Sequence, residues 1–331
     1  MWDKVRYGWL LLGLLLCGAV GCHRDSTVAA LDPQALRGTL RMPQLPEPTE
    51  PAPAADAKLR RAGRTTVRGH VMTIPPGFSA RDGSYDLVIH FHGNPNAVEE
   101  SYRRAGIDAA VVIVNLGAGA TRYIRQFADP GQLEGILRRV DTKLAERGLE
   151  RPKRRRLALS AWSAGYGAVM RVLDQPSVAA QVDAVLLLDS LHARRMPGTG
   201  GIDRQDLAPF RGFAARAAAG KALLVISHSD IEPEGPLVSV DDCSDYLLEQ
   251  VGVRRRIASG RVAPTTLEAA LAAYAPRSLF PLDLVTEARR GGLLVRGFEG
   301  RAPEHHIAHL FQMEQLVLDD LHRWWAATPG A

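Results

Sequence analysis

The 331-residue chain has few of the features that mark specialised protein classes. It has no internal period and no sustained heptads, which excludes repeat, collagen-like and coiled-coil architectures. Aromatic residues are scarce at 6%, but 46% of the chain is hydrophobic and 23% is charged. These proportions predict a globular protein with a large buried core rather than a disordered chain. The net charge of +5 is too small an excess to imply a nucleic-acid partner.

An apolar run at residues 9–20 follows a short basic segment. It is shorter than the roughly 20 residues that span a bilayer, and it is typical of a signal peptide over residues 1–21. The run leads into Ala19-Val20-Gly21-Cys22. This resembles a bacterial lipobox, with Ala19 in place of the usual Leu. The resemblance implies lipid attachment at Cys22 and a lipid-anchored protein of the bacterial cell envelope, in the outer membrane or facing the periplasm. A plain signal peptide or an uncleaved anchor is the alternative.

Cysteine is also scarce, with three in the whole chain. Cys17 would leave with the signal peptide and Cys22 would carry the lipid, so Cys243 alone remains and the mature protein can form no intramolecular disulfide. We expect Cys243 to be a partly buried structural thiol. Residues 22–64 are rich in proline, which favours extended, semi-rigid conformations. They predict a tether that holds a folded domain away from a membrane.

From Thr65 onward, apolar strands alternate with helices. We expect strands at 67–74, 85–91, 110–114, 157–161, 184–188, 222–226 and 293–298, and helices at 130–147, 164–174 and 307–325. Continuous apolar strands separated by helices predict one α/β domain over residues 65–331, with a doubly wound, mostly parallel sheet. The segment 231–292, with helical pieces expected at 246–251 and 265–274, could form a lid or side wall, or an ordinary crossover.

One sequence motif indicates a catalytic function. Ala161-Trp162-Ser163-Ala164-Gly165 follows a predicted strand and opens a helix. A sharp strand-to-helix turn needs small residues two positions before and after its apex, as Ala161 and Gly165 are. Ser163 would then project above the carboxyl edge of the sheet, beside a helix N-terminus that can stabilise an oxyanion. The motif resembles the nucleophile elbow of the α/β-hydrolase family, with Ala161 for the usual first Gly. A helix start capped by Ser163, without chemistry, is the alternative.

The resemblance covers residues 65–325 and implies serine nucleophilic catalysis on an acyl substrate, with no metal or organic cofactor. It also implies that His90-Phe91-His92-Gly93-Asn94 shapes an oxyanion hole. Backbone N–H groups near Gly93 or Asn94 would act there together with the N–H of Ala164. His92 could be a loop residue with no direct part in catalysis.

The same resemblance places the general base on the loop after the last strand, where three histidines occur. We prefer His306, followed by His305, and expect His309 to face inward. The acid would follow one of two neighbouring strands, as Asp189 or as Asp230. Either carboxylate would orient the histidine and stabilise its imidazolium form, so both remain candidates.

Two other functions compete. His90 and His92 lie on one face of a strand end, a spacing suited to a metal, and His305, His306 and His309 could add ligands. A metal-dependent hydrolase would leave the Ser163 motif unexplained. An inactive hydrolase fold could also serve as a surface-binding lipoprotein. The serine-hydrolase hypothesis predicts a small-molecule or lipid-like acyl substrate, membrane contact through the lipid anchor, and no nucleic acid. Ester, thioester, amide and peptide substrates all fit.

Overall fold

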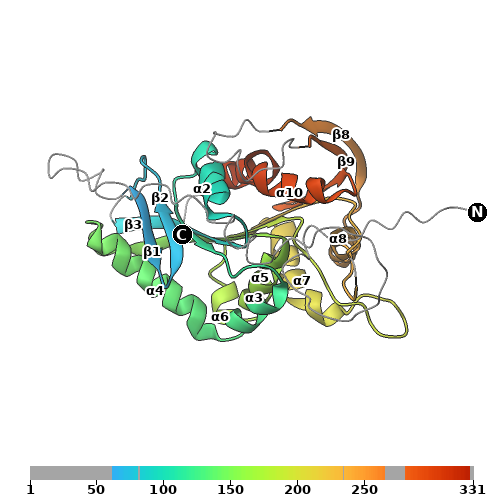
Figure 1. The fold of residues 1–331 in the computed structure, drawn as a ribbon, viewed down its shortest axis with the longest axis horizontal. Coiled ribbons are helices and arrows are strands. Elements are labelled where there is room, and N and C mark those ends of the chain that lie inside the picture. Colours follow the sequence, from blue (N-terminus) through green and yellow to red (C-terminus); the bar gives the residue numbers. More distant parts are fainter. Residues whose placement is uncertain (1–61, 81–82, 234, 265–279, 329–331) are drawn as a thin grey trace, which may run out of the picture. The chain divides into compact units, whose positions relative to one another are not determined.

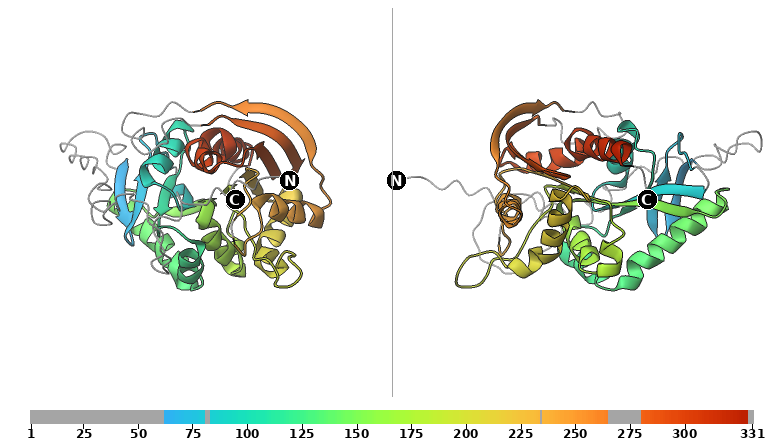
Figure 2. Two further views of the ribbon diagram at one scale, coloured as in Figure 1. Left: turned by 45° about the vertical axis from the view of Figure 1, so that its right-hand side comes forward. Right: turned by 180° about the vertical axis from the view of Figure 1, so that it is seen from behind.

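The computed structural model describes residues 62–80, 83–233, 235–264 and 280–328, which belong to one compact unit, Ala55–Ala331. Ten strands of this unit form a mixed sheet in the order β1-β2-β4-β3-β5-β6-β7-β10-β9-β8. Helices cover both faces of the sheet (Figures 1 and 2). The predicted signal peptide, Cys22, nearly all of the tether and the predicted helix at 265–274 lie outside the described residues.

The centre of the sheet is parallel and buried. Its strands are β3 (Ser84–Phe91), β4 (Ala110–Val114), β5 (Lys153–Trp162), β6 (Ala184–Leu188), β7 (Leu223–His228) and β10 (Leu293–Glu299). Every residue of β4 and β6 is buried, as expected when helices cover both faces of a parallel sheet. The predicted fold class is therefore confirmed at the level of architecture: the sheet is doubly wound and mostly parallel.

Both edges of the sheet are antiparallel. At one edge, β1 (Gly63–Val67) and β2 (His70–Ile74) form a hairpin around Arg68 and Gly69, which both have positive φ, so the strand expected at 67–74 is split by a turn. The first strand begins two residues before the expected boundary at Thr65. At the other edge, β9 (Leu282–Arg290) pairs with β10 and with β8 (Arg256–Val262). Part of the segment 231–292 therefore extends the sheet.

The helices divide between two hydrophobic cores, one on each face. One face carries α3 (Ala120–Phe127), α4 (Pro130–Glu146), α5 (Tyr166–Leu173), α6 (Pro176–Ala179), α7 (Arg204–Ala218) and α8 (Val240–Gln250). The other carries α2 (Pro95–Arg104), α10 (Pro303–Phe311), the π-helical turn η3 (Glu314–Leu318) and α11 (Asp319–Ala327). In Figure 1, α2 and α10 lie on the opposite side of the sheet from α3–α7. As expected, Asp129 caps α4, where its side chain accepts a hydrogen bond from the N–H of Gly131.

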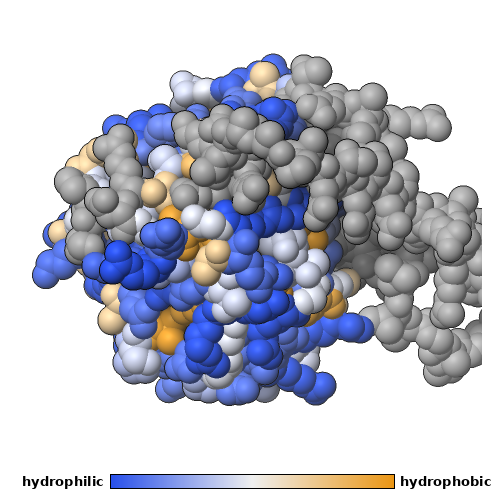
Figure 3. All heavy atoms as spheres, turned by 90° about the vertical axis from the view of Figure 1, so that its left-hand side faces the viewer, coloured by the Kyte–Doolittle hydropathy of each residue, from blue (hydrophilic) through white to orange (hydrophobic). Residues whose placement is uncertain are grey.

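Most hydrophobic side chains are inside these cores. The face in Figure 3, on the side of the β1–β2 edge, is mainly hydrophilic, with hydrophobic residues in small separate areas. In the described ranges, the exposed large hydrophobic residues are Met196, Ile257 and Phe280. The helices of those ranges are all too short or too polar to cross a membrane. Cys243 is fully buried in α8 rather than partly buried as expected, and burial raises the pKa of its thiol to about 12, which favours a structural role.

Candidate active site

Ser163 lies at the turn between β5 and α5, on the short 3₁₀ turn η2 (Ser163–Gly165). The turn brings two backbone segments together, because a Cβ atom on Gly165 would clash with the Phe91 carbonyl group, whose carbon would lie 2.8 Å away. Ala161 is fully buried two residues before Ser163. The lack of a side chain at Gly165 is therefore a steric requirement of the tight turn that the sequence predicts.

Three non-glycine residues adopt positive φ at the edge of the sheet where the parallel strands β3, β5 and β6 end. His92 (+71°), Ser163 (+50°) and Asp189 (+45°) each come directly after a strand, β3, β5 and β6 respectively. This conformation costs on the order of 1–3 kcal/mol per residue, and such strain clusters at functional sites. The two remaining described cases, Arg68 and Arg151, lie in turns away from these strand ends.

The structure joins His306 to Asp189. His306, in α10, contacts the Asp189 Oδ2 atom through Nδ1 at 2.7 Å, and both side chains are buried. Burial by itself raises the pKa of Asp189, but the hydrogen bond from His306 and the charge of that ring outweigh it, so the pKa lies well below its usual range. Asp189 is therefore a carboxylate at neutral pH. Because Nδ1 donates to it, the neutral His306 ring has Nε2 free to accept a proton.

Asp230, the other candidate acid, takes a different partner. Its backbone N–H donates to the carbonyl oxygen of Gly300 at 3.0 Å, and its Oδ2 atom accepts a hydrogen bond from the Gly300 N–H at 3.4 Å. Asp230 thus links the loop after β7 to the loop after β10, and it makes no hydrogen bond with the described histidines. Of the two candidates, the structure places Asp189 against His306.

The other two candidate histidines, His305 and His309, contact residues other than the two candidate acids. The ring of His305 packs against Phe280, with ring centroids 5.2 Å apart. His309 is fully buried, as expected, and its Nδ1 atom lies 3.0 Å from the Ser227 hydroxyl. Burial lowers the pKa of His309 to about 4, so its ring is neutral at physiological pH. Neither histidine forms a hydrogen bond with a described carboxylate.

His90 lies near the end of β3 and His92 directly follows that strand, and both make hydrogen bonds with neighbouring residues. The Nδ1 atom of His90 lies 2.9 Å from the Ser160 hydroxyl, and its Nε2 atom lies 2.7 Å from the His92 carbonyl oxygen. Burial lowers the pKa of His90 to about 3. With both ring nitrogens in hydrogen bonds, His90 has no lone pair to offer a metal ion, and the described residues contain no group of three or more ligating side chains. This geometry disfavours the metal-site hypothesis.

The rings of His92 and His306 both stack on Trp162. The ring centroids of His92 and Trp162 are 5.0 Å apart with an interplanar angle of 8°, and those of Trp162 and His306 are 4.8 Å apart at 28°. Tyr123 holds His92 through its hydroxyl, 2.9 Å from Nδ1. Burial, followed by the charge of His306, lowers the pKa of His92 to about 4. Three segments that are distant in sequence therefore meet around the residue before Ser163.

The expected oxyanion donors come from two adjacent helix starts. Phe91 and Ala161 are paired in the β3–β5 ladder, so the segments that follow them are neighbours. Gly93 has φ +121°, and a Cβ there would lie 2.8 Å from the Leu310 side chain. Asn94 caps α2, and Ala164 lies in η2 before α5. Helix N-termini favour negative charge, so this edge can stabilise an oxyanion.

No family model matches the chain. No curated protein matches it either. Among solved structures, it is similar to Est1E from Butyrivibrio proteoclasticus at 11% identity, with 80% of this chain and 99% of that chain covered and a TM-score of 0.39. It is also similar to haloalkane dehalogenase DbeA from Bradyrhizobium elkani USDA94 at 11% identity, with 80% of this chain and 99% of that chain covered and a TM-score of 0.37. It is also similar to S-formylglutathione hydrolase from Staphylococcus aureus at 14% identity, with 55% of this chain and 78% of that chain covered and a TM-score of 0.34.

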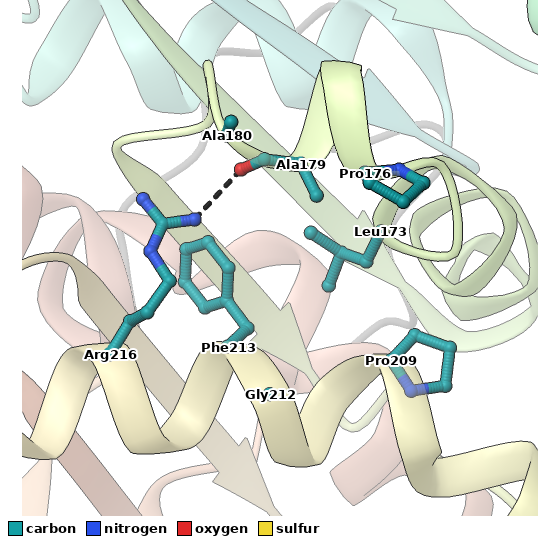
Figure 4. A pocket seen from close by; sticks show the side chains of 8 residues that line it. All are labelled: Leu173, Pro176, Ala179, Ala180, Pro209, Gly212, Phe213 and Arg216. Carbon is teal, nitrogen blue, oxygen red and sulfur yellow. Dashed lines mark hydrogen bonds between the residues drawn. The ribbon is translucent and has the colours of Figure 1, made fainter.

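Two surface hollows lie apart from Ser163. One, of about 460 Å³, lies at α6 and α7 (Figure 4) and is lined by Leu173, Pro176, Ala179, Ala180, Pro209, Gly212, Phe213 and Arg216. Its one charged group, Arg216, donates to the carbonyl oxygens of Ala179 and Val182. The other, of about 600 Å³, lies between the loop after β6 and α8. Neither is lined by a candidate catalytic residue.

Sequence reasoning missed the residues that support the site. Ser229 donates to Asp189, Ser160 contacts His90, and Trp162 contacts His306, across separations of 40, 70 and 144 residues. Ser160 and Ser229 share one signal: each is a hydroxyl that follows a short apolar run near the carboxyl end of a strand, 157–159 and 222–226 respectively. A side chain at such a position lies close to the carboxyl edge of the sheet, where it can contact the residues of the site.

Proposed function

We propose that the chain is a serine hydrolase that acts on an acyl substrate through Ser163, His306 and Asp189. The observation that supports this best is the 2.7 Å hydrogen bond between His306 and Asp189, formed beside a serine held at positive φ on a strand-to-helix turn. Ser163 is only partly buried, so a substrate can reach it. The carboxylate, the imidazole and the hydroxyl are the three groups that acyl transfer by serine requires.

In the proposed reaction, the Ser163 Oγ atom attacks the acyl carbonyl carbon while His306 Nε2 takes the hydroxyl proton. Asp189 stays ionised and stabilises the imidazolium. Backbone N–H groups of Ala164 and of Gly93 or Asn94 stabilise the oxyanion. The tetrahedral intermediate then breaks the bond to the leaving group, which receives the proton from His306. A water molecule, deprotonated by His306, releases the acid and regenerates Ser163.

A fluorophosphonate probe tests the proposal, because an activated serine displaces its fluoride and forms a stable bond to phosphorus. We expect the full-length protein to be labelled, the Ser163→Ala variant not to be labelled, and the His306→Gln variant to react at least about 10³-fold more slowly. Ser177→Ala, at an exposed serine of α6, is the matched control and should react like the wild type. A folded wild type that does not react would contradict the proposal and favour a non-catalytic binding protein. Ester substrates of increasing acyl length would then define the substrate class.

We also propose that the chain is exported and lipid-anchored at Cys22. The support is the basic start, the apolar run and the lipobox-like sequence, all in residues 1–61 outside the described part. Bacterial cells expressing the full chain and fed an alkyne analogue of palmitate should label the protein. Cys22→Ser should abolish the label and Cys17→Ser should not. Equal labelling of wild type and Cys22→Ser would contradict the proposal.

A further inference from the structure

Trp162 contacts His306 in two independent ways. Its Nε1–H donates a hydrogen bond to the carbonyl oxygen of His306 at 3.0 Å, and its ring stacks on the imidazole with centroids 4.8 Å apart. Only 8% of Trp162 is exposed. The residue directly before Ser163 is therefore packed against the residue 144 positions later that we propose as its base.

These contacts restrain a motion that Asp189 alone leaves open. One hydrogen bond at Nδ1 fixes one corner of the imidazole, but the ring can still tilt about the line from Nδ1 to Oδ2. A flat surface against the ring face removes that tilt, and the hydrogen bond to the His306 carbonyl fixes the backbone from which the ring extends. The direction of the free Nε2 atom is then defined, which a proton transfer needs.

The indole is itself held in place. The ring of His92 stacks on it at 5.0 Å and 8°, and the Tyr123 hydroxyl holds the Nδ1 atom of His92 at 2.9 Å. The same hydroxyl accepts a hydrogen bond from the Leu116 N–H at 2.9 Å. A rotation of Trp162 would therefore disturb His92 as well as His306, so the indole provides a rigid surface.

We propose that Trp162 is a positioning residue that holds the imidazole of His306 in one orientation, from which Nε2 would take the Ser163 proton in the proposed reaction. The catalytic meaning of this inference rests on the proposed function, but the positioning itself does not. The indole face has a second effect: it attracts the imidazolium that forms when Ser163 is deprotonated, as aromatic faces attract cations.

The test compares three full-length variants. Trp162→Leu removes both contacts, Trp162→Phe keeps an aromatic face but loses the N–H donor, and Trp325→Leu is the control. Trp325 has the same 8% exposure, but it lies in α11 under Arg156. The readouts are the rate constant for fluorophosphonate labelling, the downfield proton resonance of His306 Nδ1–H, and the melting temperature. Asp189→Asn identifies the resonance by its loss.

We expect Trp162→Leu to label about 10–100-fold more slowly and to broaden or shift the downfield resonance. Trp162→Phe should recover most of the labelling rate, because it keeps a ring face, but should still shift the resonance, because it loses the hydrogen bond to the His306 carbonyl oxygen. If the Leu variant fails to fold, an unchanged resonance in Trp162→Phe would overturn the proposal. Trp325→Leu should lower the melting temperature but leave rate and resonance unchanged. A wild-type rate and resonance in Trp162→Leu, or an equal loss in Trp325→Leu, would overturn the proposal. If the wild type itself does not label, the proposed function fails and the resonance alone decides the positioning role.

Discussion

Ser229 donates two hydrogen bonds to the carboxylate of Asp189, from its N–H to Oδ1 at 3.1 Å and from its hydroxyl to Oδ2 at 2.8 Å. Ser229 follows β7 and Asp189 follows the neighbouring strand β6, so the contact crosses between two adjacent strand ends. The two donors hold the carboxylate in the orientation in which it also accepts from His306. They stabilise its charged form as well.

The Ser229→Ala variant removes the hydroxyl donor and keeps the N–H donor. A hydrogen bond to a charged group contributes about 1.5–3 kcal/mol, so we expect fluorophosphonate labelling to slow by about 10-fold or more. Ser244→Ala is the matched control, because Ser244 is fully buried and its hydroxyl has no partner among the described residues. Equal rates for the Ser229→Ala variant and the wild type would show that the hydroxyl does not support Asp189.

The two candidate acids can be separated by paired substitutions. Asp189→Asn should slow labelling by about 10³–10⁴-fold, because an amide can leave His306 in the wrong tautomer. Asp230→Asn should stay within about 3-fold of wild type, because Asp230 contacts Gly300 and not His306. The rate constant for labelling by the same probe is the measurement, with circular dichroism to confirm folding. The reverse order of effects would identify Asp230 as the acid.

The turn at Ser163 depends on a glycine. In Gly165→Ala, the new methyl group would clash with the Phe91 carbonyl group, so we expect the free energy of unfolding to fall by about 3 kcal/mol. Gly212→Ala is the control: Gly212 is exposed in α7, nothing lies within 4 Å of the added Cβ, and alanine there should stabilise by about 0.5–1 kcal/mol. Urea denaturation measures both. Similar effects of the two substitutions would mean that the close approach at Gly165 is absent.

Acid should destabilise the fold. Burial lowers the pKa values of His90, His92 and His309 to about 3, 4 and 4, whereas the unfolded chain binds protons at about 6.5. Between pH 6.5 and 4 the unfolded state therefore holds more protons, so the free energy of unfolding falls as the pH falls through this window. Each histidine contributes about 1.4 kcal/mol per pH unit, and this contribution to stability is complete above pH 6.5.

Urea denaturation at pH 7.5, 6 and 5 measures this slope. A folded His309→Asn variant should lose one such contribution and keep the rest. Stability that stays constant from pH 7.5 to 5 would contradict the burial of these three histidines in their neutral form.

The elements that the sequence predicts best are those whose signals are local. The ranges of β4 and β6 match their continuous apolar runs, and α4 begins after its Asp129 cap. The strand β8 was not predicted, because most of its residues are exposed at the sheet edge and show no apolar period. The polar helix α2 was missed for a related reason: its buried side includes Glu100 and Ser101 beside few large apolar residues.

The fold class and the place of Ser163 between a strand and a helix could be predicted from local features of the sequence. A strand, a tight turn with small residues and a helix start lie within a few consecutive residues, and short-range sterics suffice to define them. The hydrogen bond of His306 to Asp189 and the stacking of Trp162 on His306 could be seen only in the tertiary structure. These partners lie more than 100 residues apart, and their contact depends on which strand ends are adjacent and on the direction of each side chain. Apolar periodicity records which residues are buried, but it carries no information about which buried residues meet.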